Sequence, residues 1–211
     1  LLFFIFLTSY LQADCIFHGN NNKISQIELL NIEKSQNFFR NIGNFYLLDK
    51  KKDNEGLKGI NIKRKYKASI KVNYQDGNSC IHNSTIRFHG DFTDHIDMIN
   101  GTPVSSLQVN LKNSNINNIT KFILLRPKSR RFDNEIFATT LYRSLGFLAP
   151  RTFKVNVKIN NVVTEFIFQE RLKKEFLEFN SRVEGPILES NEDYYNYNIF
   201  QLAKISNSEW I

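Results

Sequence analysis

The stretch Ile60-Asn-Ile-Lys-Arg-Lys-Tyr-Lys-Ala-Ser-Ile-Lys-Val-Asn-Tyr74 alternates between apolar and polar residues over most of its length. A β-strand places successive side chains on opposite faces, so this pattern predicts a half-buried strand with a charged outer face. Asp76-Gly77 then predicts a tight turn. The residues from Cys80 to His89 predict a second strand, so an antiparallel pair is expected at this point of the chain.

More strands and one principal helix follow this pair. The elements expected are strands at 106–112 and 121–125, a helix at 134–145, strands at 152–159 and 163–169, and a helix at 170–179. Gly146 and Pro150 end the first helix, and Asn160-Asn161 provides the turn of the later hairpin. The pattern predicts an α+β fold, a mainly antiparallel sheet with one crossing helix, followed by the start of a helical region.

Composition and charge restrict the possible functions. The chain has 211 residues, of which 41% are hydrophobic and 23% charged, values typical of a globular domain. Its net charge of +7 is concentrated between Lys50 and Lys71. We interpret that stretch as a solvated strand face and a lysine-rich loop, and the alternative is a surface for nucleic acid or another anionic polymer. No nucleic-acid-binding motif is present, so no specific nucleic-acid partner is expected.

The first thirteen residues suggest export. They carry no charge, have the length of the apolar core of a signal peptide, and end at Ala13, a small residue suited to cleavage. The alternative is a buried strand or helix. In an exported protein Cys15 and Cys80 can form a disulfide, while two buried free thiols are the other possibility. No transmembrane span is expected beyond this segment.

The polar stretch Ile86-Arg-Phe-His-Gly-Asp-Phe-Thr-Asp-His-Ile-Asp97 has three interpretations. His89, Asp91, Asp94 and His95 combine ligand types that suit a metal ion, with Asp97 as a further carboxylate. The same residues could form a loop over a cleft that binds substrate or nucleotide. They could also form a structural turn, in which aspartates accept backbone amides and an arginine pairs with a carboxylate.

A basic run lies just before the predicted helix. It consists of Lys121, Arg126, Lys128, Arg130 and Arg131, with no acidic residue among them, and the last four are the candidate anion-binding residues. Next to a helix N-terminus, such a run favours an anionic ligand such as phosphate or an acidic sugar, and the alternative is a solvated loop.

Several short segments follow one another along the chain: Arg87-Phe-His-Gly90, Ser106-Leu-Gln-Val-Asn-Leu111, Leu145-Gly-Phe-Leu-Ala-Pro-Arg151, Asn160-Asn161 and Phe168-Gln-Glu-Arg171. In this order they resemble the CotH-type kinase-like family of spore-coat and secreted proteins. The resemblance implies a fold like the N-terminal lobe of protein kinases. It further implies an exported atypical kinase, which transfers phosphoryl groups from ATP, with Mg²⁺ or Mn²⁺, to an envelope protein or glycan.

The resemblance also implies roles for individual residues. Arg87, Gly90 and Asp91 would lie over the phosphates, Glu135 would pair with a lysine such as Lys112, and Glu170 would lie near the adenine. Glu135, Lys112 and Asp91 are therefore the catalytic candidates. From the residues alone, Glu135 could instead stabilise the first turn of its helix, and Glu170 could form a structural ion pair with Arg171 and Lys174.

The implied organisation has four parts. They are a signal peptide at 1–13, an N-terminal extension at 14–59, a kinase-like lobe at 60–169, and a hinge helix with an incomplete C-terminal region at 170–211. The competing function is a non-catalytic cell-envelope module that binds anionic polysaccharide.

Overall fold

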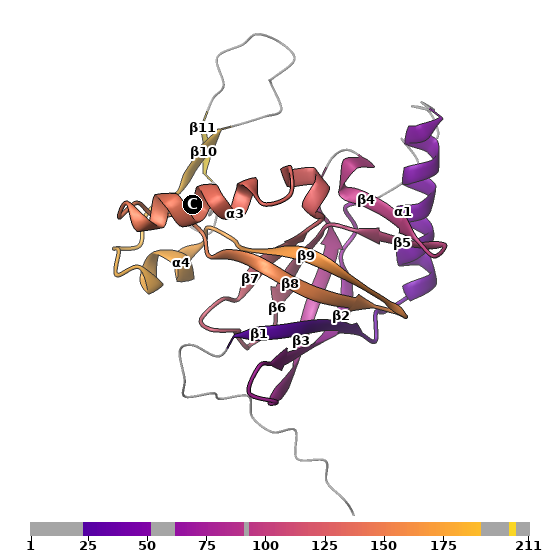
Figure 1. The fold of residues 1–211 in the computed structure, drawn as a ribbon, viewed down its shortest axis with the longest axis horizontal. Helices are drawn as coiled ribbons and strands as arrows, with labels where there is room; N and C mark the ends of the chain where they lie inside the picture. Colours follow the sequence, from indigo (N-terminus) through magenta and orange to yellow (C-terminus); the bar gives the residue numbers. More distant parts are fainter. Residues whose placement is uncertain (1–22, 52–61, 91–92, 191–202, 206–211) are drawn as a thin grey trace, which may run out of the picture.

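Seven strands of the computed structural model close into a barrel (Figure 1), in the order β1-β2-β3-β6-β7-β9-β8. The structure describes residues 23–51, 62–90, 93–190 and 203–205. The strands are β1 (Ile24–Leu30), β2 (Tyr66–Tyr74), β3 (Ser79–Phe88), β6 (Leu107–Leu111), β7 (Lys121–Leu125), β8 (Thr152–Ile159) and β9 (Val162–Glu170). Neighbouring strands run antiparallel except β1 and β8, whose parallel pairing completes the ring.

The predicted fold class is wrong, although the predicted strands and helices are present at nearly the expected positions. Instead of an antiparallel sheet with one crossing helix, resembling a kinase N-terminal lobe, the chain forms a closed, mixed barrel. The strand that changes the architecture is β1, which lies in the segment interpreted as an extension. It pairs with β2 on one side and with β8 on the other. Alternation predicts a strand but not its partners, so closure could not be predicted from it.

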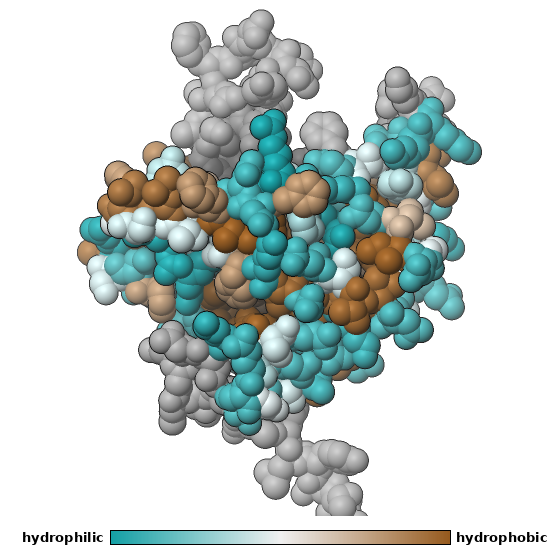
Figure 2. Space-filling model, viewed as in Figure 1, coloured by the Kyte–Doolittle hydropathy of each residue, from teal (hydrophilic) through white to brown (hydrophobic). Residues whose placement is uncertain are grey.

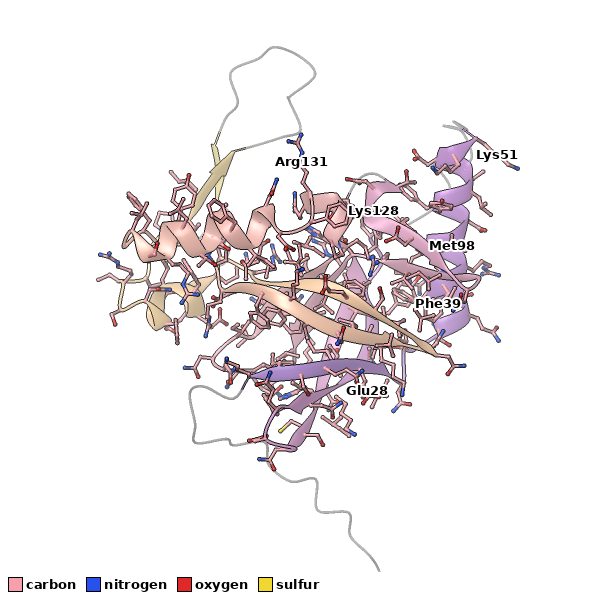
Figure 3. The ribbon with its side chains drawn as sticks, in the orientation of Figure 1. Glu28, Phe39, Lys51, Met98, Lys128 and Arg131 are labelled. Atoms are coloured by element: carbon pink, nitrogen blue, oxygen red, sulfur yellow. The ribbon has the colours of Figure 1, made fainter. Side chains whose placement is uncertain are left out.

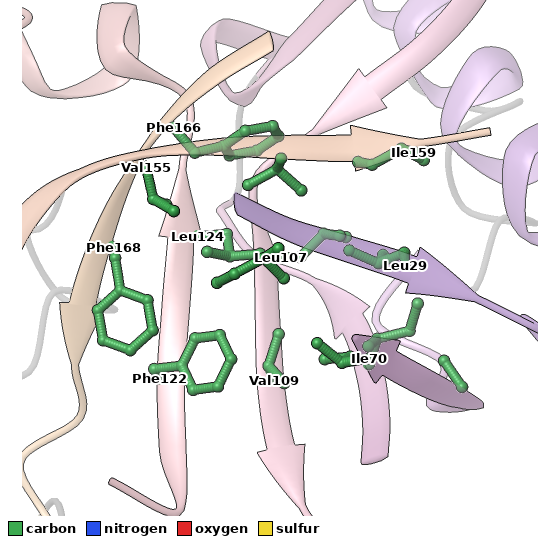
Figure 4. Close-up of a cluster of buried hydrophobic side chains, with 14 of the residues drawn as sticks. Leu29, Ile70, Leu107, Val109, Phe122, Leu124, Val155, Ile159, Phe166 and Phe168 are labelled. Atoms are coloured by element: carbon green, nitrogen blue, oxygen red, sulfur yellow. The ribbon is translucent and has the colours of Figure 1, made fainter. Parts of the chain in front are cut away.

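The barrel interior is filled by aliphatic and aromatic side chains (Figure 4). The rings of Phe122 and Phe168 stack with their centroids 4.5 Å apart, and Phe168 stacks in turn on Phe153 at 4.7 Å. Leu107 and Leu124 are fully buried beside them. Because side chains occupy the interior, the candidate site lies on the outside of the barrel.

Helices and a small hairpin cover parts of the outside. The helix α1 (Ser35–Lys50) buries Phe38 and Ile42 and contacts β5 (Thr102–Ser105) of the hairpin that β5 forms with β4 (Ile96–Ile99). The helix α3 (Asn134–Ser144) lies against β8. The remaining elements are the 3-10 turns η1 (Thr93–His95) and η2 (Pro127–Arg130), the helix α4 (Lys174–Phe179), and the strand pair β10 (Leu188–Ser190) and β11 (Ala203–Ile205).

Cys80 is buried near the start of β3 and is disulfide-bonded. Its predicted partner Cys15 and the predicted signal segment lie outside the described residues. Among the described helices, none is both long enough and apolar enough to cross a bilayer.

Replacing a buried residue of β1 tests the closure of the barrel. We expect Ile27→Ala to lower the free energy of unfolding by about 2–5 kcal/mol, because Ile27 is fully buried in the interior. The control, Val163→Ala, removes an exposed strand side chain and should cost about 1 kcal/mol or less. Chemical denaturation measures both values. Equal costs would show that β1 is not part of the barrel.

Candidate functional site

The polar stretch predicted as a site runs from the end of β3 through η1 into β4. Its two histidines are in contact, with ring centroids 5.7 Å apart and ring planes at 90°. The backbone N–H of His89 donates to the carbonyl of Ser106 at 2.9 Å, so His89 continues the pairing of β3 with the chain before β6. The stretch is therefore held to the barrel by backbone hydrogen bonds.

His95 is buried and has a structural role in this stretch. Its Nδ1 lies 3.0 Å from Oγ of Ser106, which also accepts the backbone N–H of Arg126 at 2.8 Å. Gly90 adopts a positive φ of +108°, and a Cβ added there would lie 2.2 Å from Cδ2 of His95. The glycine is thus required by the close approach of the histidine ring, whatever its relation to a phosphate.

Asp97 is the centre of an ion-pair network. Arg126 donates from Nε to Asp97 at 2.7 Å, and Lys128 donates to the other carboxylate oxygen. Burial raises the pKa of Asp97, but the hydrogen bonds and charges of Lys128 and Arg126 together outweigh burial and lower it. Arg126 also donates to the carbonyl of Glu165 at 3.0 Å and lies over the ring of Phe166. Two of the predicted anion-binding residues therefore bind a carboxylate of the protein itself.

The predicted metal ligands are only partly assembled. Asp91 lies outside the described residues. Nε2 of His95 is 3.9 Å from Asp94, a long contact, while its other ring nitrogen faces Ser106. Within the described ranges, no three His, Cys, Asp or Glu side chains lie close enough together to hold a metal ion. The metal interpretation gains no support from the described residues.

Cationic groups surround His89. Its pKa is lowered to about 3, first by burial and then by electrostatic interactions with His95, Arg130, Lys63 and Arg171. His89 is therefore uncharged at neutral pH. We call Lys63, Arg130 and Arg171, which lie around this neutral ring, the cationic cluster.

Arg130 contributes the most informative atom of the cationic cluster. Its Nε is buried and has no hydrogen-bond partner in the described part of the chain. Buried donors are almost always satisfied, so an orphaned guanidinium nitrogen calls for an acceptor. An oxygen of an anionic ligand would satisfy it. Sequence reasoning found Arg130 but missed Arg171 and the role of Lys63, because the three come from separate segments that only the fold brings together.

A polar row crosses the outer face of the barrel next to the cluster. Arg87, Gln108, Ile123 and Gln169 are cross-strand partners on β3, β6, β7 and β9. Arg87 donates from Nε and Nη2 to Oε1 of Gln108 at 2.9 and 2.6 Å, and Gln169 donates to Glu135 of α3. The row therefore has Arg87 with Gln108 at one end and Gln169 with Glu135 at the other, and the apolar Ile123 lies between Gln108 and Gln169. Neither Gln108, which stands in the strand where the resemblance implies a phosphate-binding lysine, nor Gln169 was among the predicted site residues.

Three predicted residues lie apart from this row. Glu170 is buried and forms a two-point ion pair with Arg151, with distances of 2.8 and 2.7 Å, a structural ion pair whose partner is not the expected Arg171 or Lys174. Lys112 is exposed on the bend after β6, and no ion pair joins it to Glu135 within the described residues. Arg131 is exposed at the end of η2, near Lys128 (Figure 3).

No protein-family model matches the chain, and no curated protein matches it either. The likeness to CotH-type proteins accordingly rests on the order of the short segments alone.

Adding a methyl group at Gly90 tests the contact with His95. We expect Gly90→Ala to lower the free energy of unfolding by about 2 kcal/mol or more, because backbone strain adds to the clash. Gly77→Ala is a matched control, since Gly77 also has a positive φ but open space around it, and should cost about 1 kcal/mol. Denaturation in urea measures both. A cost at Gly90 no larger than that at Gly77 would contradict the packing.

The Asp97 network predicts a pH-dependent stability. We expect Asp97→Asn to cost roughly 3 kcal/mol at neutral pH, because Arg126 loses its charged partner. The folded-state pKa of Asp97 is lowered, so the stabilisation is present above the unfolded pKa, near 4, and is lost as pH falls through the folded value. Unfolding of variant and wild type should therefore converge in acid. Asp133→Asn, at an exposed pair, should cost under about 1 kcal/mol. A cost at Asp97 independent of pH would contradict the network.

Proposed function

We propose that this protein binds an anionic ligand, bearing phosphate or carboxylate groups, at the cationic cluster. The unsatisfied Nε of Arg130 is the observation that carries the proposal. Three cationic side chains lie around a histidine that is itself uncharged at neutral pH. Guanidinium groups suit such a ligand because their planar N–H donors match the oxygens of phosphate and carboxylate.

ATP is the first candidate for the anionic ligand, because its phosphates would supply the oxygens that the cationic cluster binds. The CotH-like segments support an exported atypical kinase that transfers phosphoryl groups to an envelope protein or glycan. Arg87 lies in β3, and His89 lies one residue beyond the end of β3, where its N–H still bonds to Ser106; the cluster therefore adjoins the polar row. The disulfide at Cys80 favours an exported protein. In that function Mg²⁺ or Mn²⁺ would accompany the nucleotide.

An anionic polysaccharide is the second candidate ligand, and one observation favours it. Glu135, the proposed partner of a phosphate-binding lysine, accepts a hydrogen bond from Gln169. Among the described residues, no ion pair joins Lys112 to Glu135. Without that pair, a non-catalytic envelope module remains in competition with the kinase. Both functions use the same cations.

Thermal-shift measurements on the 211-residue chain test the proposal and distinguish the two sources. The ligands are ATP with Mg²⁺, ATP with Mn²⁺, inorganic phosphate, and heparin as a probe polysaccharide. We expect Arg130→Gln to remove most of the stabilisation by whichever ligand binds. The control, Arg182→Gln, removes the same charge from an exposed position and should leave the shift intact.

The pattern of shifts identifies the ligand class. Stabilisation by ATP that needs a divalent ion and resists moderate salt supports nucleotide binding. Stabilisation by heparin that weakens steadily with salt supports the polysaccharide. If none of the ligands shifts the melting temperature, or if Arg130→Gln behaves like Arg182→Gln, the cationic cluster is not a binding site.

A further inference from the structure

A pocket lies between the loop at residues 115–120 and the helix α4. It is open to solvent and has a volume of about 360 Å³, within the usual range for small-ligand sites. Its lining residues are one aromatic, two amides, one hydroxyl and two carboxylates, namely Phe179, Asn115, Asn118, Thr120, Glu175 and Glu178. None of them belongs to the cationic cluster or to the hydrophobic surface that Figure 2 shows along α3. The pocket is therefore a separate candidate binding site.

The aromatic wall of the pocket is held in place. Phe179 forms this wall and is 42% exposed. The guanidinium of Arg151 lies over its ring, 3.9 Å from the centroid. Arg151 is itself fixed by two hydrogen bonds to the buried carboxylate of Glu170, at 2.8 and 2.7 Å. The ring is thus restrained by a fixed arginine while much of its surface stays accessible.

The loop that forms the other wall is also held in place. Ile116 and Ile119 are buried in the core and exchange two backbone hydrogen bonds, at 3.0 and 2.9 Å. The carbonyl of Asn117, between them, accepts a hydrogen bond from Arg151 at 2.7 Å. The arginine that restrains Phe179 therefore anchors the loop as well, so both walls are arranged before a ligand arrives.

The pocket offers hydrogen-bonding groups that lack a partner in the described part of the chain. Glu175 is partly exposed; its Oε1 accepts the hydroxyl of Thr120 at 2.8 Å, while its Oε2 is buried and unpartnered among the described residues. Neither the side-chain amide of Asn118 nor the Nδ2 of Asn115 bonds to a described residue. Amides supply both donors and acceptors, and a carboxylate accepts from hydroxyls or amines.

We propose that this pocket binds a sugar ring, either uncharged or amine-bearing. Sugars carry hydroxyls at their edges, which suit amides and carboxylates, and C–H groups on their faces, which pack on an aromatic ring such as that of Phe179. Glu175 and Glu178 repel an acidic sugar, and none of the described lining residues is basic. The site does not rest on the anionic ligand proposed for the cationic cluster.

Nuclear magnetic resonance titration of the 211-residue chain tests the proposal with tetrasaccharides of three charges. They are cellotetraose, which is uncharged, its glucosamine counterpart, which carries amines, and tetragalacturonate, which is acidic. We expect at least one of the first two to bind, and Phe179→Ala to weaken that binding about fivefold or more, because the aromatic platform is lost. The control, Phe137→Ala, removes a phenylalanine that is 70% exposed outside the pocket and should bind like the wild type.

A second pair of variants tests the carboxylates. Glu178 and Glu184 both pair with Lys174, at 3.7 and 3.1 Å, but of the two only Glu178 lines the pocket. Glu178→Gln should weaken the binding of whichever sugar binds, because a charged acceptor is lost, and Glu184→Gln should not. Circular dichroism confirms that each variant is folded.

Three results would overturn the proposal. The first is that neither cellotetraose nor the glucosamine tetrasaccharide binds the wild type at millimolar concentration. The second is that Phe179→Ala or Glu178→Gln binds as well as its control. The third is that tetragalacturonate binds as tightly as the other sugars and loses that binding in Phe179→Ala, because the pocket would then accept the acidic sugars that its carboxylates should exclude.

Discussion

The parallel pairing of β1 with β8 is the constraint on which the rest of the structure depends. It joins residues 26–29 to residues 156–159 and turns a sheet with two open edges into a ring. Once the ring is closed, one face of every strand is committed to a core of phenylalanine and aliphatic side chains. Chemistry is thereby confined to the outer face and the loops at the rim.

The charges at the rim divide into two groups with different uses. Asp97 pairs with both Arg126 and Lys128, and these contacts fasten the hairpin of β4 and β5 to the barrel. Glu170 and Arg151 do the same at the end of β9. What distinguishes Arg130 is that, among the residues the structure describes, its buried Nε has no hydrogen-bond partner. The same short basic run thus contains both structural and available cations.

Local structure was largely readable from the sequence, and long-range structure was not. The alternation from Tyr66 to Tyr74 and the helical spacing from Asn134 to Ser144 identified real elements, because these periods reflect local backbone geometry. The closing strand β1 was not predicted, because which strands pair depends on contacts between distant parts of the chain. The sequence placed His89 and His95 in one candidate site, and their rings are indeed in contact. It could not show that Arg126 pairs with Asp97 while Arg130 does not, because that difference arises only when Asp97 folds against Arg126.

The closure of the barrel also has a consequence for how the chain is made. During synthesis β1 emerges from the ribosome long before β8, so about 120 residues must be added before the ring can close. Until then, β1 and the growing end of the sheet expose unpaired backbone donors and acceptors, to which other nascent chains can add. Such late, sequence-distant contacts also slow folding. A protein built this way would be expected to need protection from aggregation before its last strand is in place.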